Sequence, residues 1–281
     1  MRIHKRPLRE SPFVTALQSF CTSLRVLRRT PAIAAFAVVF GVLGGVSQAS
    51  QLTGTIGTLL QFLLAPALVG ALYTVIDGAR PRSSRDLGVV RAAQRYYVSL
   101  LGAAFLLGIL TVFLGVVLMG SAFGYVGFER GNAILNGTAS LTTTEFAVVG
   151  AASVAFFVLL FLFRFYDTAI VFDGRTAGGS ISRSINFVLG NLRSVLGYAV
   201  VATAVTGVID LPVMWVVVFD SATSVGAAIT ASQSALGPGE IAIVAVAATI
   251  TSLIARTYKV CFYRACTEPD VGGREQSMPA E

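Results

Sequence analysis

The sequence predicts an all-α membrane protein: a polytopic bundle of six transmembrane helices with amphipathic helices on the cytoplasmic side. The chain has 281 residues, of which 55% are hydrophobic and only 12% are charged, whereas about 25% are charged in an average soluble domain. Lys and Arg fall in alternate gaps between the apolar segments, 20 on one side and 1, Arg130, on the other. Because basic residues near short loops stay in the cytoplasm, both termini are predicted to be cytoplasmic and the number of spans to be even.

Six apolar segments are each at or above the roughly 20 residues needed to cross a cell membrane. The first begins at Pro31, a favourable first-turn residue because proline has no N–H to leave unpaired. This segment could instead be a signal peptide, since Ser47-Gln48-Ala49 resembles a cleavage site, but the basic leader is longer than usual for one. The outer loop at 125–144 contains a glycosylation acceptor at Asn136. The predicted spans are 31–50, 53–77, 97–124, 145–172, 194–219 and 239–265.

Charge and residue inventory exclude several classes of function. The net charge of +7 comes from residues that flank the spans, where anionic lipid headgroups neutralise them; the expected partners are therefore membrane lipids and not nucleic acid. The three cysteines fall on the predicted cytoplasmic side, so no disulfide is expected. With His4 as the only histidine, a Ser-His-Asp hydrolase, a Cys-His protease and a His-ligated zinc site are excluded. No cofactor and no enzyme activity is expected, although mechanisms built on carboxylates alone stay open.

The sequence predicts a threefold internal repeat between a cytoplasmic tail at 1–10 and a disordered tail at 267–281. Its units, 11–78, 81–174 and 176–266, each comprise an amphipathic helix followed by two spans. Apolar residues step by four and three along 11–29 and 177–196, which predicts one apolar stripe per helix at the headgroup boundary; the stripe in 83–98 is interrupted. Asp77-Gly78 and Asp173-Gly174 end the second and fourth spans, and Arg164-Phe165-Tyr166 recurs as Arg256-Thr257-Tyr258. The alternative is that basic cytoplasmic linkers are common to all six-span proteins of this orientation and that the short matches arose by chance.

On these features the chain resembles uncharacterised archaeal membrane proteins, best known in halophiles, that are related to the membrane domain attached to some glycerophosphodiester phosphodiesterases. The resemblance covers roughly 11–266 and implies a six-helix fold and a membrane location. It does not imply the phosphodiesterase activity, because the catalytic domain and its histidine-containing site have no counterpart here.

Asp210 is the first candidate for a functional residue. It lies about 24 Å into the fifth span at 1.5 Å per residue, and charged groups at such depth are costly enough to be functional candidates. Pro212 follows and removes a backbone donor, so nearby carbonyls could join the carboxylate in an ion or proton site. The alternatives are that Asp210 reaches the outer interface, or is protonated and paired with a neighbouring threonine.

The other candidates lie toward the predicted cytoplasmic ends of the spans. Arg164 and Asp167 are three residues apart, so they are expected to pair on one helix face, and Arg256 occupies the matching depth in the sixth span. These arginines could bind lipid phosphate or a substrate anion, or simply extend to the interface. Gln61 is a weaker polar candidate that interhelical hydrogen bonding would explain.

Three functions are consistent with the sequence. The favoured one is a membrane protein without a catalytic site, with a scaffold, accessory or lipid-interacting role. The second is a small transporter or permease, which requires a polar cavity joining Gln61, Asp210 and Arg164 between the spans. The third is an intramembrane enzyme acting on lipid, which requires two carboxylates, or a nucleophile and a base, at one depth. Whether the bundle centre is dry or polar distinguishes these possibilities.

Overall fold

A computed structural model describes residues 12–46, 51–80, 88–135, 139–140, 142–214 and 238–267, and every regular element in these ranges is an α-helix. The predicted tail at 1–10, the Asn136 motif and most of the predicted tail at 267–281 lie outside the described residues. The helices are α1 (Pro12–Arg29), α2 (Ala32–Val46), α3 (Gln51–Gly78), α4 (Val89–Val126), α5 (Phe128–Leu135), α6 (Thr143–Leu162), α7 (Tyr166–Asp173), α8 (Ala177–Gly190), α9 (Leu192–Met214) and α11 (Pro238–Thr267).

Five segments of the described chain are long and apolar enough to cross a membrane, which confirms the all-α class. They are Thr55–Gly78, Val89–Val126, Thr143–Asp173, Leu192–Leu211 and Ala242–Thr267. The predicted first span is counted only if α1 and α2 together form it, and these two helices are bent by 97° at the break between them. The bend falls at Thr30-Pro31, where proline disfavours helical geometry in the residue before it.

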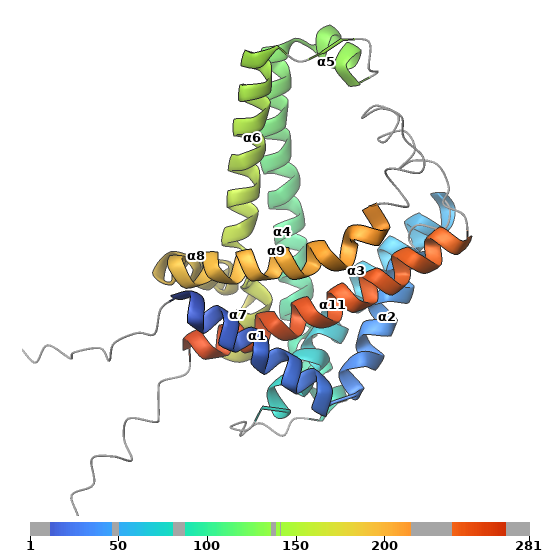
Figure 1. Ribbon diagram of the computed structural model, residues 1–281, viewed down its shortest axis with the longest axis vertical. Helices are drawn as coiled ribbons and strands as arrows, with labels where there is room; N and C mark the ends of the chain where they lie inside the picture. The colour runs from blue at the N-terminus through green and yellow to red at the C-terminus, as the bar shows by residue number, and fades with distance from the viewer. Residues whose placement is uncertain are drawn as a thin grey trace, which may run out of the picture.

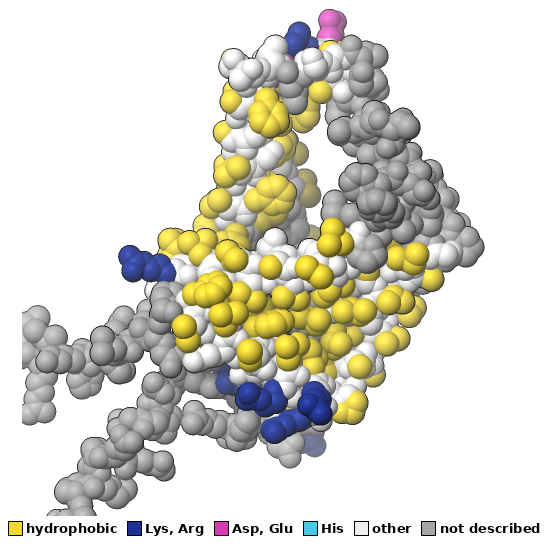
Figure 2. Space-filling model, viewed as in Figure 1, with side chains coloured by type: hydrophobic (Ala, Val, Ile, Leu, Met, Phe, Trp, Pro, Cys, Tyr) yellow, Lys and Arg dark blue, Asp and Glu magenta, His cyan; other side chains and the backbone are white. Residues whose placement is uncertain are grey.

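Two groups of helices, joined by α3, make up most of the described structure (Figure 1). α4 and α6 run antiparallel as a long pair that projects from the rest, with α5 at its tip. α9 and α11 run side by side across the body, and α11 also packs on α1 and α2. α3 lies between α2 and α4 and so joins the two parts. Figure 2 shows apolar side chains over α9, α11 and the projecting pair, with Lys and Arg gathered along the lower edge where α1 ends.

The predicted lead-in helices differ from one another in the structure. α1 and α8 are separate helices that precede α2 and α9, as the repeat predicts. The middle one, expected at 83–98, is not separate, because α4 runs without a break from Val89 to Val126 and contains its described part. No proline or capping break stands between the two predicted segments, so one continuous helix forms.

α1 packs through small residues and through part of its predicted apolar stripe, because Phe20 and Leu27 pack against the core. Ala16, Ser19 and Ser23 are buried against the body, whereas Phe13 and Leu24 of the predicted stripe are 49% and 44% exposed. α1 contacts both α9 and α11 on its buried side. The predicted single stripe is thus divided between the core and the exposed side of α1.

The small residues of α2 allow close helix contact. A Cβ atom at Gly41 would overlap Thr249 Oγ1 and lie 2.8 Å from the carbonyl oxygen of Ala245, both in α11. Only glycine permits this approach of the two backbones. Gly41 therefore has a packing role at the contact between α2 and α11.

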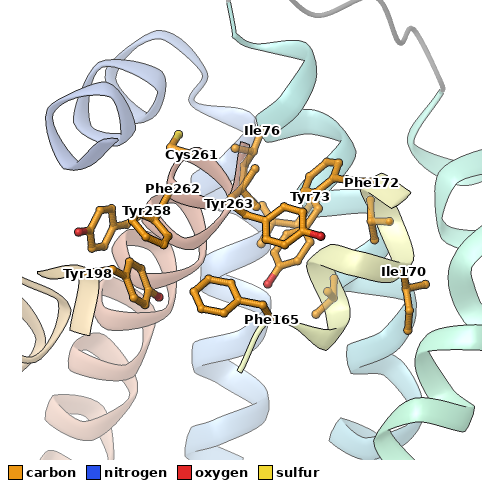
Figure 3. Packing of buried hydrophobic residues seen from close by; sticks show 14 of the residues in the cluster. Tyr73, Ile76, Phe165, Ile170, Phe172, Tyr198, Tyr258, Cys261, Phe262 and Tyr263 are labelled. Atoms are coloured by element: carbon orange, nitrogen blue, oxygen red, sulfur yellow. The ribbon is translucent and has the colours of Figure 1, made fainter. Parts of the chain in front are cut away.

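The buried core lies where α3, α7, α9 and α11 meet, and it is unusually aromatic. Figure 3 shows the rings of Tyr73, Phe165, Tyr198, Phe262 and Tyr263 converging from these elements. Ring centroids lie 4.8 Å apart for Tyr198 and Phe262 and 6.1 Å apart for Phe165 and Tyr263. Such contacts add about 0.5–1.5 kcal/mol per pair beyond area burial, so this core supplies a rigid frame for the charged groups beside it.

Candidate functional site

The fourth span is interrupted at 163–165, between α6 and α7. The N–H groups of Phe163, Arg164 and Tyr166 each donate to the carbonyl three residues earlier, so the interruption is a 3₁₀ turn. Ser184 of α8 supports the turn from outside: its Oγ donates to the Leu162 carbonyl at 2.8 Å and accepts from the Phe165 N–H at 3.0 Å. The turn places Arg164 outside the regular helix and begins α7 two residues later.

Asp167, in the first turn of α7, is the buried centre of the site. Its carboxylate oxygens lie 2.6 and 2.7 Å from Nζ of Lys259 in α11. The Tyr73 hydroxyl of α3 donates to Oδ2 at 2.7 Å, and the Thr168 N–H donates to Oδ1 at 2.8 Å. The side chains of Asp167 and Lys259 are only 8% and 12% exposed. One carboxylate thus ties α3, α7 and α11 together.

The predicted pair between Arg164 and Asp167 does not form. Among the described residues, Arg164 has no carboxylate oxygen within 4.0 Å, and Asp167 pairs with Lys259 instead. Residues three apart face each other only on an uninterrupted helix, and the turn at 163–165 removes that condition. The guanidinium of Arg164 lies 5.8 Å from the ring centroid of Tyr198.

A cavity of about 580 Å³ opens beside Asp167, a volume within the roughly 300–1,000 Å³ of ligand sites. Residues from α3, α4, α7 and α11, together with Arg164 of the turn, line it. Its wall on the α3 and α4 side is largely apolar, with Phe62 and Leu100 among the lining residues. We call this space the polar cavity, defined by the side chains of Gln61, Tyr73, Arg164, Asp167, Arg256 and Lys259.

The polar cavity carries more positive than negative charge. Arg164, Arg256 and Lys259 contribute three cations, and Asp167 is the single carboxylate among the lining residues. Asp167 is already engaged by Lys259. Arg256 has no carboxylate within 4.0 Å among the described residues and lies 4.2 Å from the ring centroid of Phe40. Within the described ranges, two arginines therefore face the cavity without a carboxylate close enough to form an ion pair.

The two Asp-Gly motifs form a separate set of ion pairs. Asp77 receives two hydrogen bonds from Arg264, at 2.9 and 2.5 Å, the bidentate geometry that suits a guanidinium and a carboxylate. Asp173 accepts from Arg183 at 2.7 Å and from the Tyr263 hydroxyl at 2.8 Å. The hydrogen bond from Arg183 to Asp173 raises the pKa of Arg183. Both aspartates bind α11 and so have a structural role.

Four of the five predicted site residues meet in the polar cavity: Gln61, Arg164, Asp167 and Arg256. Asp210 does not. It lies on α9, is half-buried, and its Oδ1 accepts a hydrogen bond of 3.0 Å from Thr251 of α11. The prediction that one cavity joins Asp210 to Gln61 and Arg164 is therefore wrong for Asp210. Asp210 instead has a threonine partner, which was the alternative. The depth of Asp210 along its helix could be predicted, but the side of the helix on which it lies depends on how α9 packs against its neighbours.

Sequence reasoning missed Lys259 and Tyr73. A signal for Lys259 was present, because extending the match of Arg164-Phe165-Tyr166 with Arg256-Thr257-Tyr258 by one residue aligns Asp167 with Lys259. Opposite charges at corresponding positions of two predicted units are candidates for a contact between those units. Tyr73 carried no such signal, since a tyrosine near a span end is usually assigned to the interface.

Comparison with known proteins identifies a protein family but no individual protein that is similar to the chain. No curated protein and no solved structure matches the chain. One protein family matches, described as a domain of unknown function (DUF7847), and the match extends over residues 14–266. It therefore includes every residue of the polar cavity and all of the helices named above except the ends of α1 and α11. The chain belongs to this family of unknown function.

Proposed function

We propose that this protein binds an anionic group, a phosphate or a carboxylate, in the polar cavity within the membrane. The observation that supports this most strongly is the convergence of Arg164, Arg256 and Lys259 around one carboxylate, Asp167. Two unit charges 4 Å apart attract by about 4 kcal/mol at an effective dielectric constant near 20. A phosphate between two arginines that have no carboxylate partner in the described part of the chain would therefore gain more binding free energy than an exposed surface ion pair provides.

The proposal includes a non-enzymatic role. A hydrolytic site of the carboxylate type needs two carboxylic groups with different tasks, whereas Asp167 is the only one that lines the cavity within the described residues. Asp167 is also bound by Lys259 and Tyr73, which leaves it poorly placed as a base. A ligand-binding role thus fits the cavity better than catalysis, and better than a scaffold role that needs no cavity.

Location and ancestry are further parts of the proposal. The chain is placed in a cell membrane with both termini in the cytoplasm, which the distribution of 20 basic residues against 1 supports. The cavity then lies toward the cytoplasmic ends of the spans. We also propose that the family is archaeal and related to the membrane domain of glycerophosphodiester phosphodiesterases, supported by the lead-in helices and the two Asp-Gly motifs.

Thermal unfolding in detergent tests anion binding. Glycerol 3-phosphate is titrated into the purified protein at constant ionic strength, with chloride as the reference salt, because screening changes with salt. We expect saturable stabilisation of the wild type, since a ligand that binds only the folded state raises its stability. Arg164→Gln should weaken this response about tenfold or more.

The matched control is Arg193→Gln, which removes the same charge from an exposed position that does not line the polar cavity. It should bind glycerol 3-phosphate as the wild type does. Equal responses of wild type, Arg164→Gln and Arg193→Gln would refute the proposed function.

A second candidate, a small transporter or permease, is favoured by the turn at 163–165. Transporters commonly place binding sites at discontinuous helices, where freed backbone groups and helix ends meet the substrate. Here the interruption contributes Arg164 to the polar cavity directly. Uptake of labelled glycerol 3-phosphate into proteoliposomes tests this role: accumulation in wild type but not in Arg164→Gln supports transport, and binding without uptake refutes it.

A further inference from the structure

An apolar groove continues the polar cavity along α3 and α4. It has a volume of about 590 Å³, and every residue that lines it is apolar. Phe62 of α3 lines both spaces. On α4 the lining of the cavity ends at Ala104, and that of the groove begins at Phe105. The polar cavity and the apolar groove are therefore neighbours along α3 and α4.

The groove has the dimensions of a lipid chain. Its α4 wall extends from Phe105 to Val116, about 16 Å at 1.5 Å per residue. That length is close to half of the roughly 30 Å hydrocarbon core, the depth of one leaflet. Phe105, Val112 and Val116 are 57%, 67% and 67% exposed, so the protein itself leaves this wall uncovered.

We infer that the polar cavity and the apolar groove together bind an anionic membrane phospholipid. The phosphate lies among Arg164, Arg256 and Lys259, and one acyl chain lies along the groove. This inference rests on the proposed function and names its ligand class. A small anion would fill only the cavity and an uncharged chain only the groove, whereas an anionic lipid matches both. A zwitterionic lipid fits less well, because its ammonium group would meet two arginines for which the described residues provide no carboxylate partner.

Gly108 allows the groove to be closed without disturbing the fold. It lines the groove, and a Cβ atom built there meets no other atom within 4 Å. Gly108→Phe should therefore place a ring in the groove while α4 stays intact. Gly120→Phe is the matched control, because Gly120 is also on α4, has equally open surroundings and does not line the groove. Equal unfolding midpoints of the two variants would show that both are folded.

The experiment counts lipids bound to the delipidated, detergent-solubilised protein by native mass spectrometry. Phosphatidylglycerol is titrated against phosphatidylcholine of the same chains. We expect phosphatidylglycerol to bind the wild type preferentially, Gly108→Phe to weaken that binding about tenfold because methylene contacts are lost, and Gly120→Phe to leave it unchanged. Glycerol 3-phosphate, which has no chain, should bind Gly108→Phe as it binds the wild type.

The outcomes separate this inference from the proposed function. Phosphatidylglycerol binding that Gly108→Phe leaves unchanged overturns the lipid inference, while glycerol 3-phosphate binding that depends on Arg164 leaves the proposed function standing. Equal binding of phosphatidylglycerol and phosphatidylcholine also overturns the lipid inference, because the charged head would then contribute nothing. If Arg164→Gln changes the binding of neither probe, both proposals fail.

Discussion

The ion pair between Asp167 and Lys259 should be the most costly contact of the site to break. Lys259→Met keeps the length of the side chain and removes its charge, leaving a carboxylate that is 8% exposed with only the Tyr73 hydroxyl and the Thr168 N–H as partners. Removing one member of a buried pair typically costs about 3–5 kcal/mol, because the other charge stays buried. We expect a loss in this range for Lys259→Met and for Asp167→Asn.

The double variant decides whether the loss belongs to the pair. When both charges are gone, neither is left buried alone, so Asp167→Asn with Lys259→Met should be more stable than the sum of the single losses predicts. A coupling free energy of about 2–3 kcal/mol is expected for groups in direct contact. Arg183→Gln serves as the comparison: its side chain is 38% exposed, and a pair so exposed contributes about 1 kcal/mol or less.

Reversible unfolding in mixed micelles, followed by circular dichroism as the fraction of denaturing detergent rises, measures these free energies. Losses below about 1 kcal/mol for both single variants, or losses that simply add, would refute the reasoning. Asp167→Asn also has a functional readout: it removes the only cavity carboxylate among the described residues, so glycerol 3-phosphate should bind it more tightly while the fold becomes less stable.

Three further predictions concern Gly41, Asp210 and the orientation of the chain. Gly41→Leu should destabilise the protein by about 3 kcal/mol or more, because its Cβ overlaps α11 and overpacking strains a core; an unchanged unfolding midpoint would contradict this contact. Asp210→Asn should leave anion binding unchanged and stability within about 1 kcal/mol, since an amide oxygen still accepts from Thr251; loss of binding would return Asp210 to the site. Single cysteines in the 125–144 loop should react with an impermeant thiol reagent from outside intact cells and those at 178–182 should not; the opposite pattern would reverse the orientation.

Part of the site was predictable because it depends on properties of single helices. Arg164, Asp167 and Arg256 stood out as charges inside apolar segments, which are rare unless they are paired or functional. Their depth along each helix followed from the rise per residue, so three charges at similar depth were expected. Their partners were not predictable, because a similar depth is available to Lys259 and to Tyr73 on neighbouring helices. Only the packing of α3 and α7 against α11 selects among them.

The class of protein, the apolar segments and four residues of the polar cavity could be predicted from the sequence alone. These follow from composition and from a helical period that each segment carries alone. The tertiary structure decided that Asp167 pairs with Lys259, that Asp210 lies elsewhere and that the groove adjoins the cavity. One reason is that the 3₁₀ turn at 163–165 is held by hydrogen bonds from Ser184 of α8, a separate helix. The other is that the sequence period of a single helix does not show which neighbouring helix it contacts.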